Sequence, residues 1–164
     1  MTERTMIGFD NGITGTIGII YPDGTSEFFK TPIIKEQNYT KAKANISRID
    51  FVKLYDILKS KDLNNAMCLI ERPMVNPGRF KASVSALRAL EATLIIVELL
   101  KIPYQYIDSK EWQRELLPKG STKDQLKKDS EDIGCRLFPQ HQELIKKHKD
   151  ADGILIAEYC RRKF

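Results

Sequence analysis

Apolar segments that each end in a single carboxylate limit how this chain can fold. In Thr5–Tyr21 an apolar strand runs into Asp10, then through a Gly-x-x-Gly corner into a second apolar strand, Thr16–Ile20. Glycine in such a bend lets the backbone and a large ligand approach each other closely. We therefore expect Asp10 at a strand end, beside a bend that a bulky polyanion can approach.

A second apolar run, Ala66–Ile70, is followed directly by Glu71, Arg72 and Pro73. Proline restricts the residue before it to extended geometry and closes a strand. The run therefore predicts a strand with Glu71 at its end.

Two further acids, Asp150 and Asp152, precede the last apolar helical pattern of the chain. Taken singly, each of the four acids could be a turn former, a helix cap or a first-turn acid favoured by the helix dipole. Carboxylates contributed by separate elements also suit Mg²⁺, which prefers oxygen ligands, whereas zinc favours Cys and His. The set predicts a divalent metal site.

The composition bounds the class of protein. The 164 residues fit one domain with a real core. No run of 18 apolar residues occurs and the N-terminus lacks a signal-peptide core, so we expect a cytoplasmic protein without a membrane partner. The three cysteines have no C-x-x-C spacing, which indicates reduced thiols and no zinc or disulfide framework.

The charge balance is modestly basic, with 27 Lys and Arg against 22 Asp and Glu. A net charge of +5 is compatible with nucleic-acid binding but does not establish it. The cations gather in three places, each of which could equally be a solvated surface. These are Arg72, Arg79, Lys81 and Arg88; Lys119, Lys123, Lys127 and Lys128; and Lys146, Lys147, His148 and Lys149.

Turn and periodicity signals predict the elements of the first half. Tyr21-Pro22-Asp23-Gly24 has the composition of a type I turn, so Thr16–Ile20 and Thr25–Thr31 should form a hairpin. Residues 32–46 are polar without periodicity, and we expect a mobile loop there. Apolar residues from Ile46 to Leu58 recur near the helical period, with Ser47 as the expected cap.

The second half predicts a long helix over about 80–100, a strand Ile102–Ile107, a helix capped by Ser109, a helix after Thr122, and a last helix from about Asp150. Phe80 opens the long helix. We expect its ring to pack into the core, as helix-start aromatics commonly do.

This order of elements and acids resembles the ribonuclease-H-like fold, and within it the RuvC-type Holliday-junction resolvases, particularly their phage and prophage relatives. The segments that carry the resemblance are FDNGITGTIG, IERPMVNPGRFKASVSALRALEA, IDSKEWQ, LFP and KKHKDADGILIAEY. The resemblance implies one RuvC-like nuclease domain over 1–164. Its fold would be α/β, a mixed five-stranded sheet with three antiparallel N-terminal strands and helices on both faces.

The resemblance further implies a homodimeric, structure-selective endonuclease that nicks a four-way DNA junction symmetrically. Asp10 would bridge two Mg²⁺ ions, with Mn²⁺ as a substitute. Glu71 would bind the ion nearer the leaving group, and Asp152 the ion that activates water. Two ions about 3.5–4 Å apart stabilise the attacking and leaving oxygens of an in-line displacement. No nucleotide cofactor is implied.

The fourth acidic position departs from the family pattern. Family members often carry Asp or His three or four residues before the last Asp, where this chain has Lys149 and His148. His148 and Asp152 would share one face of a helix. We favour Asp150 as the fourth ligand, because Asp is preferred at a cap outside the helix.

The resemblance also assigns DNA contacts. Basic residues would hold phosphates without reading sequence, and Phe80, if exposed, could wedge against unstacked bases. The expected contacts are Arg72, Asn76, Arg79, Phe80, Lys81, Lys119 and Lys123.

Other functions remain open on the sequence alone. A broader nuclease acting on flaps and Y-forks would need the same residues. FDNGITGT also fits the first phosphate loop of actin-like ATPases and sugar kinases, but those enzymes need two domains and a second glycine-rich loop. A junction-binding module that does not cut would have no need for all four carboxylates.

Overall fold

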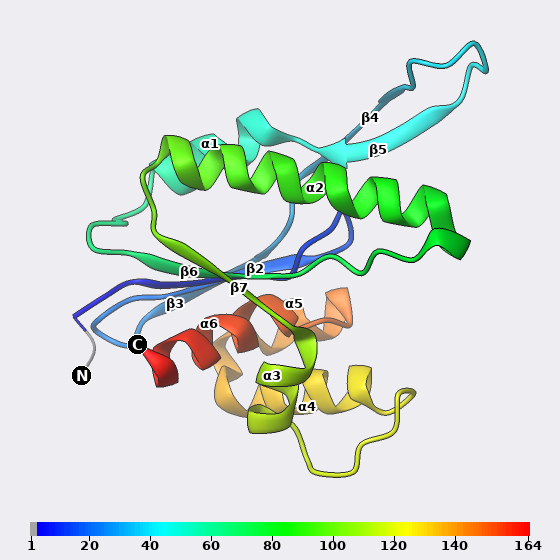
Figure 1. The fold of residues 1–164 in the computed structure, drawn as a ribbon. Helices are drawn as coiled ribbons and strands as arrows, with labels where there is room; N and C mark the ends of the chain where they lie inside the picture. The colour runs from blue at the N-terminus through cyan, green and yellow to red at the C-terminus, as the bar shows by residue number, and fades with distance from the viewer. Residues whose placement is uncertain (1–2) are drawn as a thin grey trace.

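The computed structural model describes residues 3–164, and at its centre is a mixed five-stranded sheet (Figure 1). The strand order is β3-β2-β1-β6-β7. The strands β1, β2 and β3 pair antiparallel, and β1, β6 and β7 pair parallel. Their bounds are β1 Met6–Phe9, β2 Thr16–Ile20, β3 Ser26–Lys30, β6 Met67–Glu71 and β7 Tyr104–Ile107.

Helices cover both faces of this sheet, and the expected fold class is confirmed (Figure 1). On one face lie α1 (Phe51–Lys59) and α2 (Phe80–Leu99). The other face carries α3 (Ser109–Leu116), α4 (Leu126–Leu137), α5 (Gln142–His148) and α6 (Asp152–Lys163). Short 3₁₀ turns, Pro77–Arg79 and Pro139–His141, precede α2 and α5. None of the helices described for residues 3–164 has the length and apolar character of a membrane span.

The central strands are buried on both sides, which accounts for their continuous apolar runs in the sequence. On the α1–α2 face, Ile7 and Ile17 pack in a cluster with Leu54. On the opposite face, Met6 belongs to a cluster that contains Trp112. The sheet is therefore held between two apolar layers.

Glycine allows α6 to lie directly on the sheet. A Cβ on Gly8 of β1 would collide with the backbone of Gly153 and Ala157, and one on Gly18 of β2 would collide with that of Ile154. Only a strand surface without side chains admits a helix backbone at this distance. This contact brings the start of α6 next to the end of β1.

The first hairpin is confirmed: Gly24 N–H donates to Tyr21 O at 3.0 Å between β2 and β3. The expected loop at 32–46 is wrong. It contains a second hairpin, formed by β4 (Ile33–Gln37) and β5 (Asn45–Ile49), which extends beyond the sheet (Figure 1).

The second hairpin is polar because much of it is exposed, so its alternation was hidden in the sequence. Arg48 pairs with Glu36 across the two strands at 2.5 Å. At the tip, the Asn38 side chain accepts hydrogen bonds from the amide and hydroxyl of Thr40. Cross-strand pairs and side-chain turns of this kind replace apolar alternation as the source of order.

Two expected helix caps are wrong by a few residues. Ser47 lies in β5, and α1 is capped by Asp50, whose carboxylate accepts from Lys53 N at 3.0 Å. Asp108 precedes Ser109 and forms a capping box with Glu111 at the start of α3. Asp is as good a cap as Ser, so propensity alone could not separate the choices.

Candidate metal centre and nucleic-acid surface

The sheet register brings Asp10 and Glu71 together. Phe9 of β1 lies opposite Ile70 of the parallel strand β6. Asp10 follows Phe9 and Glu71 follows Ile70, so both acids lie at the carboxyl ends of neighbouring parallel strands. This edge is where open sheets place functional groups.

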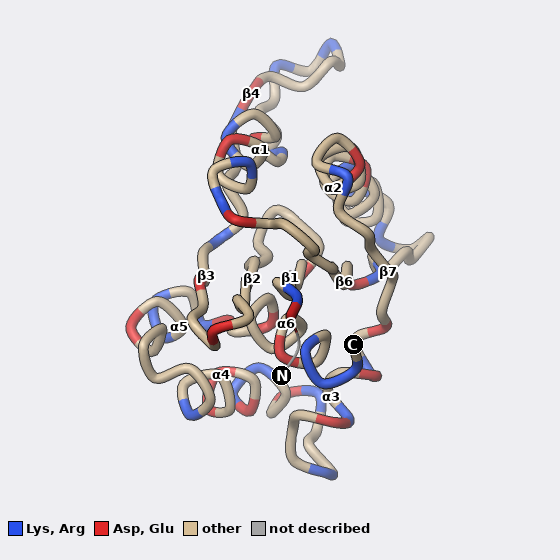
Figure 2. Tube along the Cα trace, turned by 90° about the vertical axis from the view of Figure 1, so that its left-hand side faces the viewer, with Lys and Arg blue, Asp and Glu red and all other residues tan. Residues whose placement is uncertain are grey.

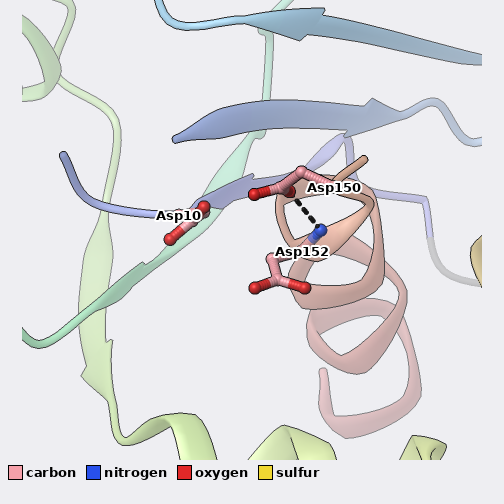
Figure 3. Close-up of side chains that lie close together, drawn as sticks. All are labelled: Asp10, Asp150 and Asp152. Carbon is pink, nitrogen blue, oxygen red and sulfur yellow. Dashed lines mark hydrogen bonds between the residues drawn. The ribbon is translucent and has the colours of Figure 1, made fainter. Parts of the chain in front are cut away.

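Asp150 and Asp152 join Asp10 from the start of α6 (Figure 3). One carboxylate oxygen from each of Asp10, Asp150 and Asp152 lies within 4.8 Å of the others. Four of the sequence-predicted residues, Glu71 included, therefore meet at one edge of the sheet.

Hydrogen bonds fix Asp150 in this cluster. Its Oδ1 accepts from the Thr16 hydroxyl and from Asp152 N, each at 2.8 Å. The Thr16 oxygen in turn accepts from Gly153 N at 3.0 Å. The N-cap position of α6 is Ala151, so Asp150 lies one residue before the position that its cap propensity predicts. It nonetheless binds the helix N-terminus through its side chain.

Two residues that sequence reasoning missed hold the other carboxylates. The buried Ser130 hydroxyl of α4 donates to Asp152 Oδ1. The indole Nε1 of Trp112, a fully buried residue of α3, donates to Glu71 Oε2 at 2.8 Å. The sequence does not reveal that a polar side chain within a helix is buried, or which group it contacts. The chain's single tryptophan, after a strand, was the only available signal.

The cluster carries negative charge that the protein does not neutralise. Burial, followed by repulsion from Asp150, Asp152 and Glu71, raises the pKa of Asp10 well above its ordinary value. Burial and Asp150 raise the pKa of Asp152 to about 7, although the Ser130 hydrogen bond opposes the change. Burial also raises the pKa of Glu71, against the Trp112 hydrogen bond.

Among residues 3–164, none of these four carboxylates forms an ion pair. Buried like charges without a counter-ion favour protonated forms. An oxygen-only donor set with excess negative charge fits a hard divalent cation such as Mg²⁺. The residues present therefore fit the metal that the sequence predicted.

His148 does not belong to the group of three carboxylates whose oxygens lie within 4.8 Å of one another. It is the last residue of α5, and its ring centroid lies 6.4 Å from that of Phe28. Burial, with Lys30 and Lys147 nearby, lowers the pKa of His148. Asp150, the alternative that we favoured, is the residue that lies in the cluster.

The predicted DNA contacts fall into two separate regions. Arg79, Phe80 and Lys81 are exposed together where α2 begins, and Asn76 caps the preceding 3₁₀ turn by accepting from Gly78 N. Lys119 and Lys123 lie in the exposed α3–α4 loop, on the opposite side of the sheet (Figure 1, Figure 2).

Two of these side chains depart from expectation. The packing of Phe80 into the core is wrong, because the residue is 73% exposed. The buried face of α2 is instead formed by residues further along the helix, such as Ala89 and Val97. Arg72 is not a free cation: it pairs with Asp108 at 3.0 Å, and its guanidinium lies 5.3 Å from the Tyr106 ring centroid.

The strand order, the helices on both faces and the acids at one edge define the ribonuclease-H-like class of fold. The chain resembles a solved structure of Thermus thermophilus RuvC in complex with Holliday junction substrate. That comparison has a TM-score of 0.58 and 15% sequence identity, and covers 97% of this chain and 96% of that one. The chain therefore has a RuvC-type fold.

A further Thermus thermophilus RuvC structure aligns with a TM-score of 0.49 at 13% identity, over 93% of this chain and 90% of that one. No protein-family model and no curated protein sequence matches the chain.

Proposed function

We propose that residues 1–164 form a metal-dependent nuclease domain that resolves four-way DNA junctions by paired symmetric nicks. The observation that carries the proposal is the meeting of Asp10, Asp150 and Asp152 within 4.8 Å, beside Glu71, on a RuvC-type fold. The solved relative with this fold was in complex with a Holliday junction substrate. A four-way junction is therefore the first substrate to test.

The four carboxylates would hold two Mg²⁺ ions, or Mn²⁺ in their place. Asp10 is suited to contact both ions, because it neighbours Glu71 on one side and the Asp150 and Asp152 pair on the other. Divalent ions in such sites act as Lewis acids on the phosphate and lower the pKa of water.

The remaining side chains prepare the site. Thr16, Ser130 and Trp112 each donate a hydrogen bond to one carboxylate and so restrict its rotation. Such outer partners orient metal ligands and are worth about 10–100-fold in metal affinity or activity. Arg79 and Lys81 would hold phosphates of the junction, and Phe80 would contact unstacked bases.

Symmetric nicks require two active sites related by a two-fold axis, and a homodimer supplies them. The outward side of α2 supports this proposal, because Leu87 and Leu99 are 45% and 65% exposed. Leu87→Glu should convert the dimer to a monomer, as measured by light scattering at micromolar concentration with and without junction DNA. A wild-type monomer under both conditions would contradict the dimer.

The function is tested by incubating the protein with Mg²⁺ and a labelled four-way junction, next to duplex, flap, Y-fork and RNA–DNA hybrid. We expect paired nicks in the junction and intact duplex. Equal cutting of flaps and forks would identify a broader debranching nuclease. Binding without cutting would identify a junction-binding module, and ATP hydrolysis without either would favour the actin-like alternative.

A further inference from the structure

A groove of about 820 Å³ lies between the β4–β5 hairpin and α2. One wall comes from residues 38–39 and 44–49 of the hairpin, and the other from the first four turns of α2. The hairpin was not predicted from the sequence, and its tip extends beyond the sheet (Figure 1). None of the four candidate metal ligands lines the groove, although Phe80 and Lys81, two of the proposed DNA contacts, do.

The α2 wall and the hairpin tip next to the groove are basic. Lys81 and Arg88 line the α2 wall, and Arg48 lines the hairpin wall. Lys41 and Lys43 lie at the hairpin tip, outside the lining residues. Figure 2 shows the cations of the hairpin tip and of the start of α2. Within residues 3–164, Lys41, Lys43, Lys81 and Arg88 form no ion pair and are exposed.

Two carboxylates lie close to the groove without cancelling this charge. Glu36 is already paired with Arg48, and Glu91 lies among the lining residues further along α2. The open end, between the hairpin tip and the start of α2, therefore favours an anion.

The same open end presents aromatic rings to solvent. Tyr39 is 95% exposed on the hairpin side and Phe80 is 73% exposed on the α2 side, and both line the groove. Phe51 lines it as well and is 47% exposed. Exposed aromatic rings between cations are the features with which proteins bind unpaired nucleotides: the rings stack on bases and the cations follow the phosphates.

The groove is continuous with the loop that carries the candidate metal ligand. Ile13, three residues after Asp10, lines it. Asn11, between them, donates from Nδ2 to Ala86 O of α2 at 3.1 Å, which fastens this loop to the helix. This loop therefore connects the acidic cluster to the groove.

We propose that the groove binds an unpaired DNA strand next to the branch point and guides it toward Asp10. This inference rests on the proposed function. Its occupant is a polyanion with exposed bases rather than a second copy of the chain, because two copies of this cationic surface would repel each other. A volume inside the ~300–1,000 Å³ range of small-ligand sites holds only a few nucleotides.

The test measures DNA binding by the full chain in EDTA, so that cutting does not interfere. The probes are a fluorescein-labelled four-way junction, a Y-fork with two unpaired arms, and a blunt duplex. Tyr39→Ala should weaken binding to the fork by roughly tenfold, the scale of one lost base stack. Duplex binding should be unchanged.

The double variant Lys41→Ala/Lys43→Ala should lower the salt slope of fork binding by about 0.7 for each lost phosphate contact. Lys53→Ala/Lys59→Ala is the matched control, because it removes the same charge from α1, outside the groove. It should leave the slope unchanged. All replaced side chains are exposed, and thermal melts would check that the variants fold.

A fork with 5-iododeoxyuridine in one unpaired arm adds a positional measurement, and ultraviolet light should cross-link it to the peptide that contains Tyr39. Fork binding equal to that of wild type in both Tyr39→Ala and the Lys41→Ala/Lys43→Ala variant would overturn the inference, while junction cutting by the wild type would uphold the nuclease. A change from dimer to monomer in Tyr39→Ala with unchanged fork binding would assign the groove to a second copy. A wild type that neither binds nor cuts branched DNA would refute the nuclease and the groove together.

Discussion

The two faces of the sheet are built differently. The candidate metal site lies on one face, and most of the surface proposed to bind DNA lies on the other. On the α6 face, the candidate metal ligands are half-buried and are fixed by hydrogen bonds and by glycine contacts between helix and strands. On the α2 face, aromatic and cationic side chains are exposed, and those of the groove form no ion pair within residues 3–164 apart from Arg48 with Glu36. In the proposed function, the first face binds small ions and the second face binds a large partner.

The energetics of the two faces also differ. The acidic cluster is a source of local instability, because its carboxylates repel one another and their pKa values rise. The exposed side chains of α2 and the hairpin cost the isolated protein little. Mutations in the acidic cluster should therefore act on cutting and on stability, and mutations of the exposed cations and aromatic rings on the α2 face on DNA affinity.

The largest effect should follow from the loss of a metal ligand. Asp10→Asn and Glu71→Gln should each slow junction cutting by roughly a thousandfold, because metal stabilisation is worth several kcal/mol and each 1.36 kcal/mol is tenfold. Binding to the junction in Ca²⁺ should persist, since the α2 face is unchanged. The control is Asp23→Asn, which changes an exposed turn acid. Full cutting by either ligand variant would refute the active-site assignment.

A smaller loss of activity should follow when an outer partner is removed. Trp112→Phe keeps an aromatic ring in the core but deletes the donor to Glu71 Oε2. Loss of such a partner costs about 10–100-fold in metal affinity or activity. The activity should recover in part at high Mg²⁺ concentration, which a purely structural role of the indole would not produce. The measurement is the cutting rate against Mg²⁺ concentration, with a melt to verify folding.

The third prediction concerns stability in EDTA. Asp152 has a pKa of about 7 in the folded protein, above its ordinary value of 3.8. The folded state therefore binds more protons than the unfolded state between these values, and stability falls as the pH rises through this window. Asp152→Asn cannot ionise and escapes this loss.

At pH 8 the variant should consequently have a melting temperature several degrees above that of wild type in EDTA, on a scale of about 2–4 °C per kcal/mol. The gap should narrow toward pH 5. Mg²⁺ should raise the melting temperature of wild type more than that of the variant, because the ion binds the folded state. A melting temperature below that of wild type for the variant at pH 8 would show that the Asp152 carboxylate of wild type is not under repulsion.

The acids at strand ends could be anticipated from the sequence, because an apolar run that stops at one carboxylate places that carboxylate where the buried strand ends. The placement of Asp10 beside Glu71 requires only that their two strands pair in parallel, and continuous apolar runs are typical of buried parallel strands. Thr16, Ser130 and Trp112 could not be assigned, because each reaches its carboxylate across elements that are far apart in the chain. The β4–β5 hairpin was missed because its order comes from polar contacts of Glu36, Arg48 and Asn38, which leave no periodic pattern.

The smallest expected effects belong to single cations of the α2 face. Arg79→Ala and Lys81→Ala should each weaken binding to junctions of unrelated sequence by a similar factor and lower the salt slope by roughly 0.9. Arg72→Ala should behave differently, because Asp108 already pairs with that guanidinium. Its slope should change less than those of the other two. Binding isotherms at several salt concentrations decide the matter: unchanged slopes for Arg79→Ala and Lys81→Ala would mean that both side chains are only solvated, and that the binding face lies elsewhere on α2 or the hairpin.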